Sequence, residues 1–209
     1  MAELRENIGA PSPIPLLMPG YRVPKAWQNA RRESEGADAL TLRAAARGAG
    51  VSQAAPYRHF TDKDGLLAAV AEEGFRLMTA GMRAAAAAHP DDAIGALRAC
   101  GLAYIAFARA HPAHFRVMFG RYVANRAAHP DLREAAGEAF AQVEACIVAG
   151  QQAGFVVEGD VTSLAITSWA TIHGLASLLV DGQLEERGGD PDGLASAVTA
   201  ALFLGIGRR

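Results

Sequence analysis

Side chains that can bind the edges of DNA bases lie close together in the front third of the chain. Gln53 can pair with an adenine edge, and Arg58 can pair with a guanine edge or hold a phosphate. Side chains that can donate hydrogen bonds to phosphate oxygens surround them, namely Thr41, Tyr57, His59 and Lys63. This combination of side chains indicates binding to a nucleic acid through both its phosphates and its base edges.

Two short helices must position these side chains. Helical spacing predicts a helix over residues 41–49, ended by Gly50, and a second over residues 52–60, capped by Ser52. Two short helices joined by a tight turn form a helix-turn-helix, whose second helix lies in the DNA major groove. A plain helical hairpin with solvated charges has the same periodicity, so spacing alone leaves both interpretations open.

Charge is distributed unevenly along the 209 residues. Residues 21–65 carry eight Lys and Arg against five Asp and Glu, a net charge of +3, so the overall charge of −2 leaves −5 for the remainder. A basic front end favours an anionic partner. The hydrophobic content of 51% excludes a mainly disordered chain.

The rest of the chain is predicted to be helical. From Gly36 onward Ala and Leu recur at helical spacing, and no alternating strand pattern of useful length occurs. Capping and breaking residues divide this part into helices. The first starts at Thr61 or Asp62 and runs to about Ala88, and the next starts at Asp91 or Asp92 and runs to about Ala110. The others cover about 113–122, 131–153, 162–184 and 192–206. We predict an all-α chain with a helix-turn-helix DNA-binding domain followed by an antiparallel helical-bundle regulatory domain.

The segment from Asp38 to Phe75 resembles the DNA-binding segment of the TetR family of transcriptional regulators. The resemblance rests on Leu42–Leu67, with Tyr57-Arg58-His59-Phe60 followed by Lys63. It implies a homodimer that binds a double-stranded DNA operator and is controlled by a small molecule, with a repressor as the expected role. It also implies phosphate contacts from Thr41, Tyr57 and Lys63 and base contacts from Gln53, Ala54, Ala55 and Arg58.

The first 35 residues depart from that family pattern. Prolines throughout residues 1–24 forbid a continuous helix, so a mobile arm is expected there. Residues 25–35 should form an amphipathic first helix, but only Ala26, Trp27 and Ala30 offer apolar contact. Either the segment packs differently with Trp27 as an anchor, or it reflects a misread frame, which sequencing of codons 1–40 decides. The alternative function is therefore a dimeric small-molecule-binding protein with impaired or lost DNA binding.

Trp169, His173 and Gly174 resemble the subgroup of the same family whose C-terminal domain is named for Trp, His and Gly. Trp169 and His173 are four residues apart and share one helix face. They are either core residues that position the helix or part of an effector cavity. For a cavity, we expect a bulky, largely apolar effector and a lining of Tyr104, Phe107, Phe115, Met118, Phe119, Phe140, Trp169 and His173.

Two neighbouring segments without charge lie near the C-terminus. Residues 161–180 could span a bilayer by length, but they contain seven Ser, Thr and His residues. We instead expect no membrane contact and a four-helix dimer interface, two helices from each subunit. The predicted interface residues are Leu175, Leu178, Leu179, Leu194, Val198 and Leu202.

Other functional classes find little support. The sequence has no Gly-rich phosphate loop or nucleophile elbow, and His111 and His114 lack a Cys or carboxylate at metal-ligand spacing. Glu72 and Glu73 are interpreted as surface charges, and Cys100 and Cys146 as buried free thiols. We predict a cytoplasmic protein that is not an enzyme and has no cofactor or metal. Its predicted parts are an arm (1–24), a DNA-binding domain (25–75) and an effector-binding and dimerisation domain (76–209).

Overall fold

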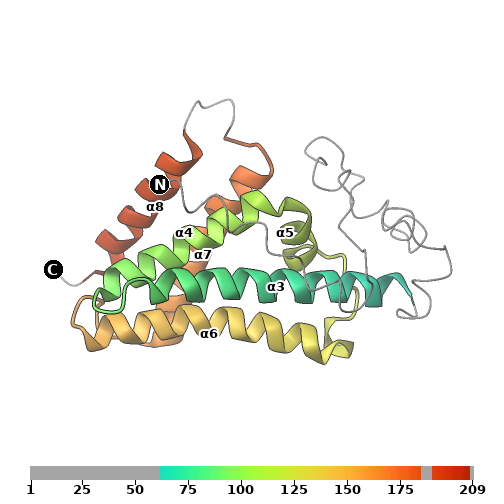
Figure 1. Cartoon of the computed structure of the whole chain (residues 1–209), viewed down its shortest axis with the longest axis horizontal. Coiled ribbons are helices and arrows are strands. Elements are labelled where there is room, and N and C mark those ends of the chain that lie inside the picture. Colours follow the sequence, from blue (N-terminus) through green and yellow to red (C-terminus); the bar gives the residue numbers. More distant parts are fainter. Residues whose placement is uncertain (1–61, 185–189, 208–209) are drawn as a thin grey trace.

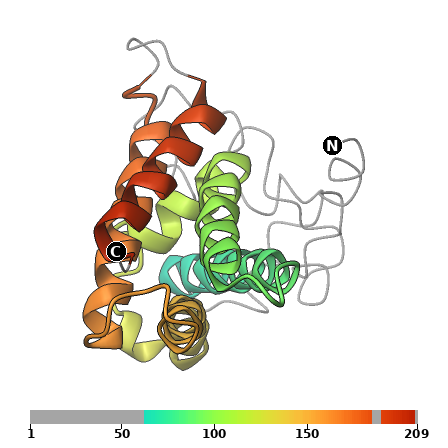
Figure 2. The same ribbon diagram turned by 90° about the vertical axis from the view of Figure 1, so that its left-hand side faces the viewer.

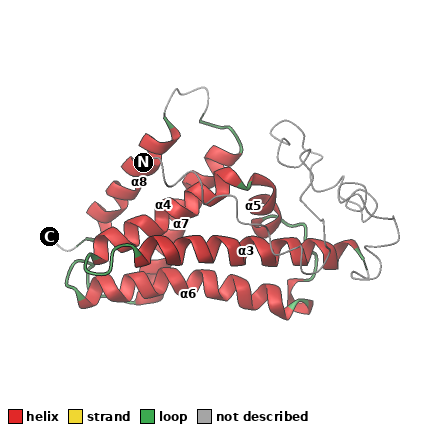
Figure 3. Cartoon of the chain, in the orientation of Figure 1, coloured by secondary structure: helices red, strands yellow, loops and turns green. Residues whose placement is uncertain are grey.

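The computed structural model describes residues 62–184 and 190–207. The predicted arm, the first helix and the predicted binding residues from Thr41 to His59 lie outside these ranges. Regular structure within them is entirely helical (Figure 3), which confirms the all-α prediction. The helices are α3 (Lys63–Ala87), α4 (Ala93–Ala110), α5 (Pro112–Phe119), the 3₁₀ helix η5 (Arg126–Ala128), α6 (Pro130–Gln152), α7 (Val161–Val180) and α8 (Pro191–Ile206).

Aspartate side chains cap the N-terminal ends of α3, α4, α7 and α8. Each carboxylate accepts the backbone N–H of the residue three positions later, at 2.8 to 2.9 Å, and the four residues are Asp62, Asp92, Asp160 and Asp190. These bonds satisfy amides that have no partner inside the helix. The starts predicted for α3 and α4 are therefore confirmed with their capping residues.

Glycines in the left-handed conformation end α6 and α7. Gly154 has φ of 75° and Gly182 has φ of 70°. In each case the following amide bonds back to a carbonyl of the last turn, Phe155 to Gly150 at 2.9 Å and Gln183 to Leu178 at 3.0 Å, which is a Schellman ending. The end of α6 agrees with the prediction. The predicted end of α7 at residue 184 is wrong, because Gly182 ends the helix at Val180.

Helices α3 and α6 lie side by side with their N-terminal ends at the same end of the molecule, and α4 lies across them (Figure 1). Helix α3 packs mainly against α4, α6 and α5, whereas α7 packs against α4, α6 and α8. Figure 2 shows α7 and α8 together on one side of the molecule. Helices α4 and α7 are long and apolar enough to cross a membrane by length and composition, a property that core helices of soluble proteins share.

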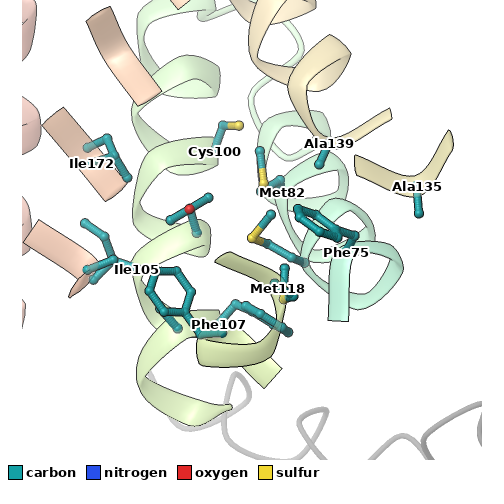
Figure 4. Packing of buried hydrophobic residues seen from close by; sticks show 14 of the residues in the cluster. Phe75, Met82, Cys100, Ile105, Phe107, Met118, Ala135, Ala139 and Ile172 are labelled. Carbon is teal, nitrogen blue, oxygen red and sulfur yellow. The ribbon is translucent and has the colours of Figure 1, made fainter. Parts of the chain in front are cut away.

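The hydrophobic core forms where α3, α4, α5 and α6 meet (Figure 4). Phe75, Met82, Cys100 and Met118 meet there and are all at least 96% buried. Helices α3 and α5 approach closely at Gly74, where an added Cβ would lie 2.5 Å from the Met118 sulfur. Only glycine leaves room for that side chain. Both cysteines are buried and free, as predicted.

Candidate functional site

A cavity of about 290 Å³ lies among α3, α4, α6 and α7, and we call it the inner cavity. Its wall is almost entirely apolar or aromatic and consists of Phe75, Met78, Met82, Tyr104, Phe119, Ala136, Ala139, Phe140, Val143 and Trp169. Among the described residues, Arg126, in the connection between α5 and α6, is the one charged residue in the wall. A mainly apolar wall with one charged group is typical of a small-molecule site.

A second cavity of about 330 Å³ lies between α5 and the C-terminal end of α7, and we call it the side pocket. Its wall is more polar and consists of Phe115, Arg116, Phe119, Gly120, Tyr122, His173, Ser177, Val180 and Asp181. Phe119 is common to both cavities. Its ring centroid lies 4.5 Å from that of His173 and 6.2 Å from that of Trp169, so these rings separate the two spaces.

The structure divides the eight predicted effector residues. Tyr104, Phe119, Phe140 and Trp169 line the inner cavity, whereas Phe115, Phe119 and His173 line the side pocket. Phe107 and Met118 line neither space. The Phe107 ring packs on His111 with centroids 5.0 Å apart, and Met118 is fully buried.

A chain of hydrogen bonds crosses the aromatic wall. Trp169 Nε1 donates to Tyr104 Oη at 3.3 Å, and Tyr104 Oη lies 2.7 Å from His173 Nδ1. His173 Nε2 continues to Ser177 Oγ at 3.4 Å. An indole N–H can only donate, so the Tyr104 oxygen accepts from Trp169 and its proton is available for His173 Nδ1. The imidazole then carries its proton on Nε2 and donates to Ser177.

Burial sets the protonation of this chain. It lowers the pKa of His173 below its usual range and raises that of Tyr104 above its own. Both groups are therefore neutral at pH 7, as the direction of the hydrogen bonds requires. The interpretation of Trp169 and His173 as pure core residues is incomplete, because each side chain also lines a cavity.

The α5–α6 connection contacts both the inner cavity and the first turn of α3. Asp64, on that turn, accepts the Ala124 backbone N–H at 2.6 Å and the His129 Nε2 proton at 2.8 Å. These bonds, with that from His129 the larger, lower the pKa of Asp64. Arg126 lies between the two contacts in sequence and donates to the Met118 carbonyl. We call Asp64, Ala124 and His129 the α3 clamp.

Glu73 lies in a different environment from the one predicted. It is only 6% exposed, and its carboxylate lies 3.4 Å from Nε2 of the equally buried His114. Its interpretation as a surface charge is wrong. The sequence does indicate that Glu73 is buried, because Glu73 lies seven residues after Leu66 and so falls on the same helix face as that buried leucine. Glu72 is partly exposed and pairs with Arg76 at 2.9 Å.

His111 and His114 lie side by side at the start of α5. No group of three or more His, Cys, Asp or Glu that could hold a metal ion occurs within residues 62–184 and 190–207. Burial lowers the pKa of His111, and its ring packs against His114 with centroids 5.8 Å apart. The two rings therefore pack together, with His114 buried and His111 half-buried.

The predicted dimer residues occupy different environments within one chain. Leu175 is buried in the core, and Leu179, Val198 and Leu202 pack against the core. Leu194 is half-buried, and Leu178 is 37% exposed. The outward faces of α7 and α8 present Leu178, which is one of the predicted residues, together with Ile166 and Leu204. Small residues lie between them: Ala170, Gly174, Ala197 and Ala201.

Of the predicted DNA-binding residues, the structure describes only Lys63. Lys63 is the first residue of α3, directly after the capping Asp62. It lies one residue before Asp64 of the α3 clamp. The first turn of α3, which follows the predicted helix over residues 52–60 in sequence, is thus joined to the wall of the inner cavity.

Together, these helices and cavities define an all-helical protein with a candidate small-molecule site. Two family models match the chain. Residues 33–70 match "Bacterial regulatory proteins, tetR family", and residues 97–202 match "Tetracyclin repressor-like, C-terminal domain". The chain belongs to the TetR family of bacterial regulatory proteins.

Solved structures agree with this assignment. A protein of unknown function from a Rhodococcus species is 32% identical, with a TM-score of 0.73 over 88% of this chain and 92% of that chain. The TetR family transcriptional regulator PfmR from Thermus thermophilus is 19% identical, with a TM-score of 0.67 over 83% and 93%. The ketosteroid transcriptional regulator KstR2 of Mycobacterium tuberculosis is 17% identical, with a TM-score of 0.66 over 88% and 92%. The comparison with curated proteins gives no match.

Proposed function

We propose that this chain is a ligand-responsive transcriptional repressor that acts as a cytoplasmic homodimer and is not an enzyme. The observation that carries the proposal is the connection between the inner cavity and α3. Arg126 lines that cavity, and its neighbours Ala124 and His129 hold the first turn of α3 through Asp64. The C-terminal domain is proposed to be of the Trp-His-Gly type, with Trp169 and His173 at the two cavities.

DNA binding is proposed for residues 41–63. Gln53, Ala54, Ala55 and Arg58 would face bases, and Thr41, Tyr57, His59 and Lys63 would face phosphates. The test is binding of the purified chain to DNA from upstream of its own gene, against a scrambled duplex at two salt concentrations. Arg58→Gln should lose about 1–3 kcal/mol of discrimination between the two duplexes.

Two further variants help to distinguish a loss of base contacts from a loss of phosphate contacts. Lys63→Gln should weaken binding to both duplexes and reduce the slope of log affinity against log salt by about one. Arg83→Gln removes an exposed charge near the far end of α3 and serves as the matched control. Equal loss of binding in the Arg58, Lys63 and Arg83 variants would argue against a specific DNA-binding surface at residues 41–63.

A homodimer interface is proposed on the outward faces of α7 and α8. Ile166, Ala170, Gly174 and Leu178 recur every four residues along α7 and so share one face. Exposed apolar residues on neighbouring helices favour burial by a second copy. In sedimentation experiments Ala170→Glu should yield monomers, whereas Ala141→Glu, at an exposed alanine of α6, should leave a dimer.

The alternative, a dimeric small-molecule-binding protein without DNA binding, is favoured by one observation. The match to the family's N-terminal model begins at residue 33, which leaves residues 25–32 outside it. A folded dimer that binds small molecules but no DNA selectively would support this alternative. Selective DNA binding that no small molecule alters would instead overturn the ligand-responsive part of the proposal.

A further inference from the structure

We propose that the ligand of the inner cavity is an amphipathic monocarboxylate, with its apolar body against the aromatic wall and its carboxylate on Arg126. This inference rests on the proposed function and deepens it by naming the chemical class of the effector. It is carried by Arg126, the one cation that the described residues place in the wall of a mainly apolar cavity.

The Arg126 guanidinium uses little of its bonding capacity within the chain. Its side chain has five N–H donors, and the acceptor that the structure gives it is the Met118 carbonyl. No carboxylate pairs with it within residues 62–184 and 190–207. Asp64, whose partners belong to the same connection, is bound to Ala124 and His129. A half-buried cation without an anion is costly, so a guest that brings one negative charge gains from it.

The geometry of a guanidinium favours a carboxylate. Its planar fork matches the two oxygens of a carboxylate, and such charge-assisted pairs are about twice as strong as neutral hydrogen bonds. A single cation balances a single negative charge. The remaining wall residues, from Phe75 to Trp169, offer carbon and sulfur surfaces with the Tyr104 hydroxyl and the Trp169 indole N–H already paired to each other. The rest of the guest must therefore be apolar.

The cavity volume sets the size of the guest. A volume of about 290 Å³ holds about ten non-hydrogen atoms if each takes about 30 Å³, the share of one water molecule in the liquid. Decanoate is close to this size. Decan-1-ol has the same chain with a neutral head, so the pair isolates the contribution of the charge.

The experiment measures binding through Trp169, which lines the cavity. In a Trp27→Phe background Trp169 is the one remaining tryptophan, and its fluorescence reports binding at this wall. Both probes are titrated, below their aggregation concentrations, into that parent and into Arg126→Gln, Arg126→Lys and Arg121→Gln variants. Arg121 is an exposed arginine of the same connection and is the matched control. Circular dichroism confirms that each variant is folded.

The parent should bind decanoate more tightly than decan-1-ol. Arg126→Gln should weaken decanoate binding about 10- to 100-fold, the range for a hydrogen bond to a charged group, and change decan-1-ol binding less than about threefold. Arg126→Lys should recover part of the loss, and Arg121→Gln should change neither probe. Equal affinities of the parent for the two probes, or equal decanoate affinities of the parent and Arg126→Gln, would overturn the inference.

The outcomes also distinguish this inference from the proposed function. If both probes bind equally well and release the DNA, the regulator remains ligand-responsive and only the carboxylate class is wrong. If neither probe changes Trp169 fluorescence, the inner cavity does not take amphipathic guests of this size and the inference is wrong. Selective DNA binding is measured separately and is unaffected by either result.

Discussion

Two arginines lie at the two cavities and differ in what the chain provides for them. Arg116, in the side pocket, donates to the Val180 carbonyl at 2.9 Å and lies 3.5 Å from the Asp181 carboxylate. Arg126, in the inner cavity, has the Met118 carbonyl and no carboxylate among the described residues. The first guanidinium is neutralised by its own chain, whereas the second keeps its charge available.

This difference gives the two cavities different roles. At the side pocket, Arg116 holds the C-terminal end of α7 against α5, where a cation favourably meets the last carbonyls of a helix. Apart from Arg126, the inner cavity is built from apolar side chains and from Tyr104 and Trp169, whose polar groups bond to each other. The arginine of the side pocket therefore stabilises the fold, whereas the arginine of the inner cavity is available to a guest.

Removal of the ring that separates the cavities should have the largest effect. Phe119→Ala deletes contacts with Phe75, whose ring centroid is 5.3 Å away, and with His173 at 4.5 Å. We expect a loss of about 3 kcal/mol in the free energy of unfolding, the lower end for a buried Phe because Phe119 is partly exposed. Chemical denaturation measures it. The merged space should also bind longer-chain carboxylates than decanoate.

Phe155→Ala provides the control for this prediction. Phe155 is 49% exposed, so its loss should change the free energy of unfolding by less than about 1 kcal/mol. Equal losses in the two variants, with no change in the preferred chain length, would show that Phe119 does not separate the cavities.

Loss of the hydroxyl at the centre of the wall should have the next largest effect. Tyr104→Phe removes the acceptor of the Trp169 N–H and the donor to His173. Two part-buried polar groups would lose their partner, so the free energy of unfolding should fall by about 1–2 kcal/mol. Tyr122→Phe is the control, because that hydroxyl makes no hydrogen bond to a described residue. An unchanged Tyr104→Phe variant would mean that the chain of hydrogen bonds contributes nothing to stability.

The comparison of the two arginines is sharpened by Arg116→Gln. It should lower the free energy of unfolding by about 1 kcal/mol, because its partners are part-exposed and water replaces some of the lost bonding. Decanoate affinity, measured by Trp169 fluorescence, should stay within about twofold of the parent, in contrast to the loss expected for Arg126→Gln. A similar loss of decanoate affinity in both variants would show that the cavities do not differ in the proposed way.

The sequence predicts the helices better than the division of the site. Capping aspartates and helix-ending glycines are local signals, and they place α3, α4, α6 and α8 within a few residues. The aromatic residues also stand out. Their assignment to two cavities depends on where Phe119, at the end of α5, comes to lie against α7, and helical periodicity within one segment does not encode that position.

The cavity position of Arg126 is even harder to predict from the sequence. It belongs to a three-residue 3₁₀ helix in a connection, where no periodic pattern distinguishes a solvated arginine from one in a cavity wall. Glu73 illustrates the opposite case. Its position on the buried face of α3 was readable, but its partner His114 lies 41 residues later, and only the packing of α5 on α3 brings the two together.

The smallest expected effect is a change in the pH dependence of stability, and it concerns His173 in the aromatic wall between the two cavities. Burial lowers the pKa of His173 below its ordinary value of 6.5, so between the two values the unfolded chain binds more protons than the folded chain. The free energy of unfolding must then fall as the pH drops below about 6.5. Asp181, the carboxylate of the side pocket, is paired with Arg116 and does little to stabilise the imidazolium.

The measurement compares the wild type with His173→Asn by denaturation at pH 7.5 and pH 5.5. The variant should lose less stability on acidification, and His111, whose pKa burial also lowers, contributes equally to both proteins and cancels. Tyr104→Phe should also show a weaker pH dependence. In the wild type, protonation of His173 Nδ1 makes it a donor, so it can no longer accept the Tyr104 proton. Without the Tyr104 hydroxyl, protonation of His173 breaks no such hydrogen bond. Identical pH dependences in all three proteins would show that His173 is protonated equally well in the folded and unfolded chain, and that the hydrogen bonds across the wall do not require a neutral imidazole.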